Sequence, residues 1–104
     1  MSKLGYPFIP VHPGEIIKEE LQSRGISQKH FADIVGISYT MLNDILNAKR
    51  PVSTDFALLL EAATGINADM LVNMQARYNM QIARKDSKNI SRFEQLRKVC
   101  ASFL

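Results

Sequence analysis

The segment 39–47 places hydrogen-bonding side chains on one face of an expected helix. Tyr39, Thr40 and Asn43 lie within one turn of one another, opposite an apolar stripe that contains Leu42. An amide such as that of Asn43 can bond adenine through two hydrogen bonds, and a threonine can bond a base or contact a thymine methyl group. These side chains could therefore read the edges of DNA bases. A polar helix face taken alone, however, is usually only solvated.

A repeated three-residue pattern predicts where the helices end and begin. It occurs at 25–27 (Gly-Ile-Ser), 36–38 (Gly-Ile-Ser) and 65–67 (Gly-Ile-Asn). Glycine takes the left-handed conformation that closes a helix, and the Ser or Asn two residues later caps the next helix. The isoleucine between them can pack on an apolar residue five positions on. The pattern indicates three helix–turn–helix junctions.

These junctions and the apolar spacing predict an all-α domain of five helices. The expected helices cover about 13–24, 28–35, 39–47, 54 to the low sixties, and 68 into the eighties. Ile34, Leu42, Ile45 and Phe56 are expected in the core. A proline-containing arm over residues 1–12 precedes the domain at 13–85, and no strand pattern is present.

The second and third helices have the proportions of a helix-turn-helix, since only three residues join them. That arrangement presents the outer face of the second element to the DNA major groove, which is about 12 Å wide. Gln28 and Lys29 begin the first element, where free N–H groups favour a phosphate. Lys49 and Arg50 follow the second element and are placed for the other flank of the backbone.

Composition is consistent with a soluble globular protein and favours no enzyme. The chain has 104 residues, 46% hydrophobic and 22% charged, and a net charge of +3. Residues 1–25 and 26–55 are each neutral, and the excess lies in 56–104. His12 and His30 are isolated and Cys100 is the sole cysteine, so we expect no metal site, cofactor or small-molecule ligand. Without a secretion signal or an apolar run long enough to span a membrane, a cytoplasmic location is expected.

The last segment, 86–104, is expected to be a linker at 86–89 followed by a short helix that opens with a capping box, Ser91 to Glu94. Its apolar residues recur every three or four positions, and such a short helix is unstable alone. It must fold back on the domain or pair with another chain. The candidate dimer-interface residues are Leu71, Met74, Tyr78, Phe93 and Leu96.

The stretches "HPGEIIKEELQSRGISQKHFADIVGIS" and "LNDILNAKRPVSTDFALLLEAATGINADMLVNMQARYNM" resemble the HigA-type (VapI-like) antitoxins of the Cro/lambda-repressor helix-turn-helix family. The resemblance covers about 12–84. It implies a lambda-repressor-like fold and a homodimer that binds a palindromic operator in double-stranded DNA, represses its own operon and neutralises an mRNA-cleaving RelE-like toxin.

Carried over by position, the resemblance places particular residues on the DNA. Ser38, Tyr39, Thr40 and Asn43 would lie in the groove, and Gln28, Lys29, Lys49 and Arg50 would contact phosphates. The family often has glycine at position 48, where this chain has alanine, so Asn47 is expected to take the left-handed conformation instead. The fifth helix is expected to contribute to dimerisation.

Two other functions fit the sequence. The chain could be a solitary phage- or plasmid-type repressor with no toxin partner. It could also be a protein-interaction module that has lost DNA binding, which the neutrality of residues 1–55 supports because non-specific DNA affinity grows with the number of phosphate contacts.

Overall fold

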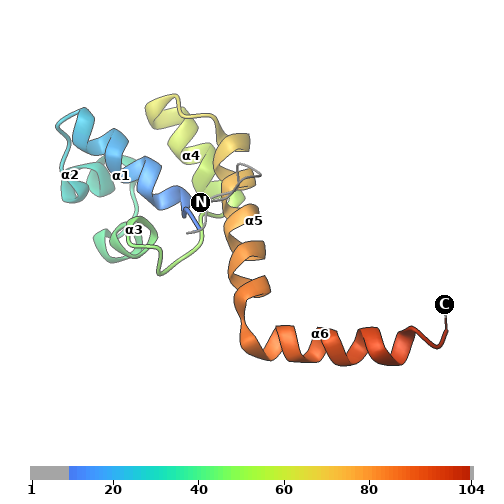
Figure 1. Cartoon of the computed structure of the whole chain (residues 1–104). Coiled ribbons are helices and arrows are strands. Elements are labelled where there is room, and N and C mark those ends of the chain that lie inside the picture. Colours follow the sequence, from blue (N-terminus) through green and yellow to red (C-terminus); the bar gives the residue numbers. More distant parts are fainter. Residues whose placement is uncertain (1–9, 104) are drawn as a thin grey trace.

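The computed structural model describes residues 10–103, so most of the N-terminal arm lies outside the described residues. It contains α1 (Pro13–Ser23), α2 (Gln28–Val35), α3 (Tyr39–Leu46), α4 (Thr54–Thr64), α5 (Ala68–Lys85) and α6 (Ser87–Cys100). No strand occurs in this range. The all-α prediction is confirmed, and Figure 1 shows α1 to α4 gathered on one side of α5.

The glycine closures and the Ser and Asn caps predicted at the helix junctions are confirmed. Gly25, Gly36 and Gly65 have φ of 69°, 77° and 82°, the left-handed region that favours glycine. The caps Ser27, Ser38 and Asn67 accept hydrogen bonds from the main-chain N–H groups of His30, Met41 and Met70. The intervening isoleucines 26, 37 and 66 pack against the core. These junctions follow from local hydrogen bonding, which explains why the sequence predicts them.

The core lies among α1, α3, α4 and α5. Its fully buried side chains include Ile17, Leu42, Ile45, Leu60 and Leu71. The expectation that Ile34 is also buried is wrong, because 61% of its surface is exposed. In α2 the buried residues are Phe31 and Ala32, and a residue three positions after Phe31 lies on the flank of that face rather than at its centre.

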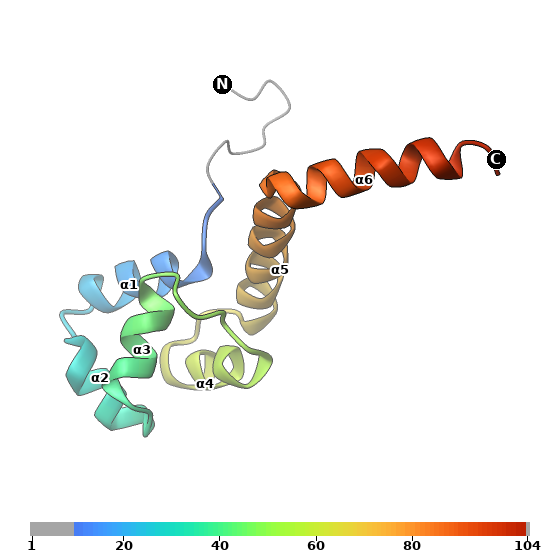
Figure 2. The ribbon, with the colours of Figure 1, turned by 90° about the horizontal axis from the view of Figure 1, so that it is seen from below.

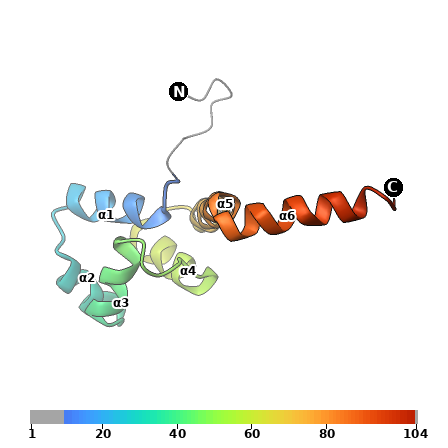
Figure 3. The ribbon, with the colours of Figure 1, turned by 60° about the horizontal axis from the view of Figure 1, so that its bottom comes forward.

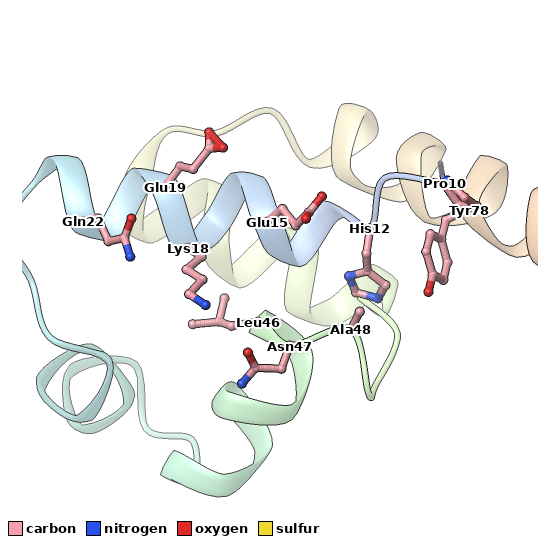
Figure 4. Close-up of a pocket in the computed structure, with 10 residues that line it drawn as sticks. All are labelled: Pro10, His12, Glu15, Lys18, Glu19, Gln22, Leu46, Asn47, Ala48 and Tyr78. Atoms are coloured by element: carbon pink, nitrogen blue, oxygen red, sulfur yellow. The ribbon is translucent and has the colours of Figure 1, made fainter. Parts of the chain in front are cut away.

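The start of α1 is fixed by His12, which is only 3% exposed. Its Nδ1 accepts a hydrogen bond of 2.9 Å from the N–H of Gly14 and so caps the helix. Its ring makes a T-shaped contact with the Tyr78 ring, with 4.9 Å between centroids. Figure 4 shows the imidazole between the start of α1, Ala48 and Tyr78. His12 therefore joins three separate elements.

Acid is expected to destabilise the protein through His12. Burial lowers the pKa of His12 below 6.5, and the backbone of Arg50 and the Glu15 carboxylate offset this only in part. The unfolded chain therefore binds the proton more readily, so the contribution to stability is complete above pH 6.5 and is lost as the pH falls through the lower, folded pKa. Urea unfolding between pH 8 and pH 5 measures this loss.

The matched variants are His12→Asn, which keeps a cap acceptor without a titrating ring, and His30→Gln, which removes an exposed histidine. We expect His12→Asn to flatten the dependence of the unfolding free energy on pH and His30→Gln to leave it unchanged. An equal acid loss in His12→Asn and the wild type would contradict the assignment.

The C-terminal segment differs from the sequence prediction. No four-residue linker separates α5 from α6; Asp86 ends one helix and caps the next by accepting from the N–H of Lys88 at 2.8 Å. Asn89 donates to the carbonyl of Ala83, which satisfies a free acceptor at the end of α5. Because Asp86 already caps α6, Ser91 lies inside the helix and does not begin it. The alternative that this helix folds back on its own domain is not seen (Figure 1).

Candidate nucleic-acid interface

The helix-turn-helix predicted from the sequence is present as α2, the turn 36–38 and α3. These two helices lie at the opposite end of the molecule from α6, as Figures 2 and 3 show. Tyr39 and Thr40 are exposed at the start of α3, and Asn43 is half-buried one turn later. Half of the surface of Tyr39 is open to solvent. The start of α3 therefore presents an accessible polar face.

Three amides form a connected network beneath this face. The side-chain N–H of Asn43 donates to Oε1 of Gln28 at 3.0 Å, which ties α3 to the first residue of α2. Asn47 donates in turn to the main-chain oxygen of Asn43 at 2.9 Å and to its Oδ1 at 3.2 Å. The second N–H of the Asn43 side-chain amide makes no bond within this network. Gln28 and Asn47 fix the rotamer of Asn43. The network pre-positions Asn43 for a ligand in front of α3.

Gln28 therefore has a positioning role that the sequence did not indicate. It was expected to contact phosphate, whereas its carbonyl oxygen is directed to Asn43. The two residues are fifteen positions apart, so only the packing of α2 on α3 reveals the pair. Ser38 likewise uses its hydroxyl to cap α3, by accepting from Met41 at 3.0 Å. That Gln28 and Ser38 also touch DNA stays a prediction.

The basic residues stand at the two edges of the same region. Lys29 is exposed in the first turn of α2, and Lys49 and Arg50 are exposed in the loop after α3. A buried amide holds that loop: Oε1 of Gln75 in α5 accepts from the N–H of Val52 at 2.8 Å. Gln75 is 6% exposed, and its partner is 23 positions away in the sequence, so no local pattern could have found it.

Ala48, not Asn47, takes the left-handed conformation after α3. Ala48 has φ of 62°, whereas Asn47 has φ of −102°. The reason lies in the helix end: Lys49 N–H bonds the carbonyl of Asp44, and Ala48 N–H bonds that of Ile45. This pair of bonds is the Schellman motif, which fixes the residue two places after the last helical one as left-handed. The expectation for Asn47 is thus wrong.

Ala48→Gly is expected to raise the free energy of unfolding by about 0.5–1 kcal/mol, because relief of a left-handed alanine outweighs the added entropy of glycine. Chemical denaturation measures the change. Ala63→Gly is the matched control, since Ala63 is exposed inside α4, where the same substitution should cost about 1 kcal/mol. A loss of stability in Ala48→Gly would contradict the claim that the left-handed conformation of Ala48 is strained.

Comparison with known proteins decides the family. A helix-turn-helix family model matches residues 17–71, more than half of the chain. The chain belongs to the helix-turn-helix family. It is 34% identical over 82 residues to virulence-associated protein I of Dichelobacter nodosus, an alignment that spans 78% of this chain and 76% of that protein.

Two solved structures of antitoxins share the fold of this helix-turn-helix protein. The HigA-family addiction-module antidote of Coxiella burnetii has a TM-score of 0.72 and 33% identity over 82% of this chain and 95% of that one. Pseudomonas aeruginosa HigA, solved with the higBA promoter, has a TM-score of 0.73 and 31% identity over 83% and 92%. The resemblance to HigA-type antitoxins and the lambda-repressor-like fold are confirmed, and the expectation that the chain is not an enzyme agrees with a family of DNA-binding helix-turn-helix proteins.

Within residues 10–103, no helix is both long enough and apolar enough to cross a membrane. The same part of the chain contains no group of three potential metal-ligating side chains.

Proposed function

We propose that this helix-turn-helix protein is the cytoplasmic antitoxin of a type II toxin–antitoxin pair, which represses its own operon by binding a palindromic operator as a homodimer. In this proposal it also binds and silences a RelE-like, mRNA-cleaving toxin. The exposed start of α3, with Asn43 fixed by Gln28, is the observation that carries the DNA-binding part. Pseudomonas aeruginosa HigA, a structural relative, was solved with promoter DNA, which supports the same part.

The residue roles follow from chemistry and position. Tyr39, Thr40 and Asn43 read base edges, with Ser38 beside them at the helix cap. Lys29, Lys49 and Arg50 contact phosphates on either side of this face. Gln28 contributes a further phosphate contact at the start of α2, where the main-chain N–H groups of the first turn are free. Lysines and arginines flank the polar face, so charge supplies affinity while the neutral side chains supply base choice.

For the homodimer, the candidate residues now separate into two groups. Leu71 has no exposed surface and belongs to the core of its own chain, so it cannot form an interface. Tyr78 is half-buried against His12 in the same chain. Phe93 and Leu96 are exposed, and Met74 is half-buried on the outer side of α5. We retain the last three as interface residues.

Operator binding is tested by fluorescence anisotropy with the duplex upstream of the gene and a scrambled duplex of the same length. We expect selective binding to an inverted repeat, and Lys49→Ala should weaken both duplexes alike and flatten the slope of log K against log salt by about one unit. Binding with neither a salt slope nor a sequence preference would favour the interaction module without DNA binding.

The toxin is tested separately. We expect a neighbouring reading frame for a small toxin, which this chain co-purifies and whose mRNA cleavage it blocks. One relative, an Escherichia coli protein 27% identical over 81% of this chain, is named as an uncharacterized HTH-type transcriptional regulator. An operator-binding chain without such a neighbour would therefore be a solitary repressor.

A further inference from the structure

The last helix, α6, has an apolar stripe that nothing in its own chain covers. It has no buried residue. Its exposed apolar side chains are Ile90, Phe93, Leu96 and Val99, with 43% to 50% of their surface open, and Phe103, 77% exposed, follows the helix. A helix of 14 residues is marginal in water without packing. The stripe therefore indicates that α6 is covered in an assembly.

The charges of this region indicate what covers it. The segment 76–98 has seven basic residues and two acidic ones, a net +5, so the remainder of the chain has +3 − 5 = −2. Along α6, at about 100° per residue, Arg92 and Arg97 fall on the two margins of the apolar stripe. Two α6 helices packed side by side would bring like charges together. An α6 packed on the body of a second copy would join opposite charges, because Glu61 and Asp69 lie around the start of α5.

Each copy has a surface on α5 that can receive the α6 helix of the other copy. The outer face of α5, opposite the buried Leu71 and Gln75, has two adjoining hollows. One is lined by Asn67, Asp69, Met70, Asn73, Met74 and Arg77. The other is lined by Ala76, Arg77, Met80, Gln81 and Arg84. Figures 1 and 3 show that α6 leaves α5 on the side away from α1 to α4, which is the side of this face.

A second copy seated on this face would lie in the corner between α5 and α6. A two-fold axis that crosses α5 at right angles makes the two α5 helices antiparallel, so the start of each one lies beside the end of the other. The α6 helix is about 21 Å long, whereas packed helix axes are about 8–10 Å apart. It therefore passes the neighbouring α5 and reaches the turn between α4 and α5 of the second copy.

We propose that α6 is an exchanged arm: it docks on the second copy of this chain, across the first turn of α5 and the α4–α5 turn, and its apolar stripe closes the dimer. This inference rests on the homodimer of the proposed function and assigns α6 its place in that dimer. Phe93 and Leu96 supply the apolar contact, and Arg92 and Arg97 face the acidic start of α5.

The test compares two substitutions of the full-length chain at neighbouring positions. Leu96→Glu puts a charge into the apolar stripe, whereas Gln95→Glu adds the same charge to the opposite, polar face. Sedimentation equilibrium without DNA is expected to show a dimer dissociation constant at least tenfold weaker for Leu96→Glu and unchanged for Gln95→Glu. Circular dichroism checks that both variants remain folded. A Leu96→Glu dimer as tight as the wild type overturns the proposal.

A distance measurement separates arm exchange from pairing of the two arms. A nitroxide is attached to the double variant Gln95→Cys, Cys100→Ser, which labels the polar face of α6. Arm exchange sets the two labels about 30–40 Å apart, from the helix lengths and spacings. Labels within about 20 Å would mean that the arms pair with each other, which overturns the proposal.

The outcomes also separate this inference from the proposed function. A wild-type dimer that fails to bind the operator overturns the function and leaves the arm exchange standing. Operator binding by a dimer insensitive to Leu96→Glu does the reverse, and a monomeric wild type overturns the exchange together with the homodimer.

Discussion

Asn43→Ala is expected to weaken operator binding by about 1–3 kcal/mol, roughly a 5- to 150-fold rise in Kd. The amide lies one turn into α3, and its side-chain N–H is fixed on Gln28 at 3.0 Å, so its contact with a base costs little further ordering. Removing it also leaves one base pair unread, and selectivity should relax at that position alone. Competition anisotropy against a set of single-base operator variants measures both effects.

Two further variants identify the cause of the loss. Gln28→Ala leaves the Asn43 amide in place without its support, and we expect a smaller loss centred on the same base pair. Gln95→Ala truncates an amide on the exposed polar face of α6 and should leave binding unchanged. If Asn43→Ala keeps the affinity and selectivity of the wild type, α3 does not read the operator through this residue.

Gly14→Ala is expected to lower the free energy of unfolding by about 3 kcal/mol. A Cβ built on Gly14 would fall well inside the contact distance of the main-chain oxygen of Ile45, and 3.0 Å from Nδ1 of His12. The neighbour is backbone and cannot rotate away, so α1 and the end of α3 must separate. Because small domains are stable by only about 5–15 kcal/mol, this is a large fraction of the total.

Chemical denaturation checks the prediction, and Glu19→Ala is the control. Glu19 is exposed on α1, so its replacement should change stability by no more than about 0.5 kcal/mol. The separation also moves the loop with Lys49 and Arg50, which follows α3 directly. A variant with wild-type stability would show that α1 and α3 approach each other less closely than the structure indicates.

The sequence alone predicted the helices and most of their ends. Gly25, Gly36 and Gly65 close helices, and the Ser and Asn caps open the next ones, as expected. Such features depend on hydrogen bonds between residues two to five positions apart, which a sequence displays directly. The same locality explains why the helix-turn-helix and the exposed Tyr39 and Thr40 could be predicted.

The tertiary structure decided the features that depend on residues far apart in the chain. The bond between Gln28 and Asn43, the bond between Val52 and Gln75, and the approach of Gly14 to Ile45 each join separate helices or loops. Two local predictions failed. The last helix begins after the cap Asp86 and not at the capping box of Ser91. The hydrogen bonds after α3 give the left-handed conformation to Ala48 and not to Asn47.

The sequence thus determined that this protein has an exposed polar face on a short capped helix, because periodicity and capping are local. Only the tertiary structure decided that Asn43 is held by a neighbouring helix and that α6 projects away from the body with its apolar stripe uncovered. Both depend on which surfaces meet when the helices pack, and packing partners are set by the shape of the whole core rather than by any one segment.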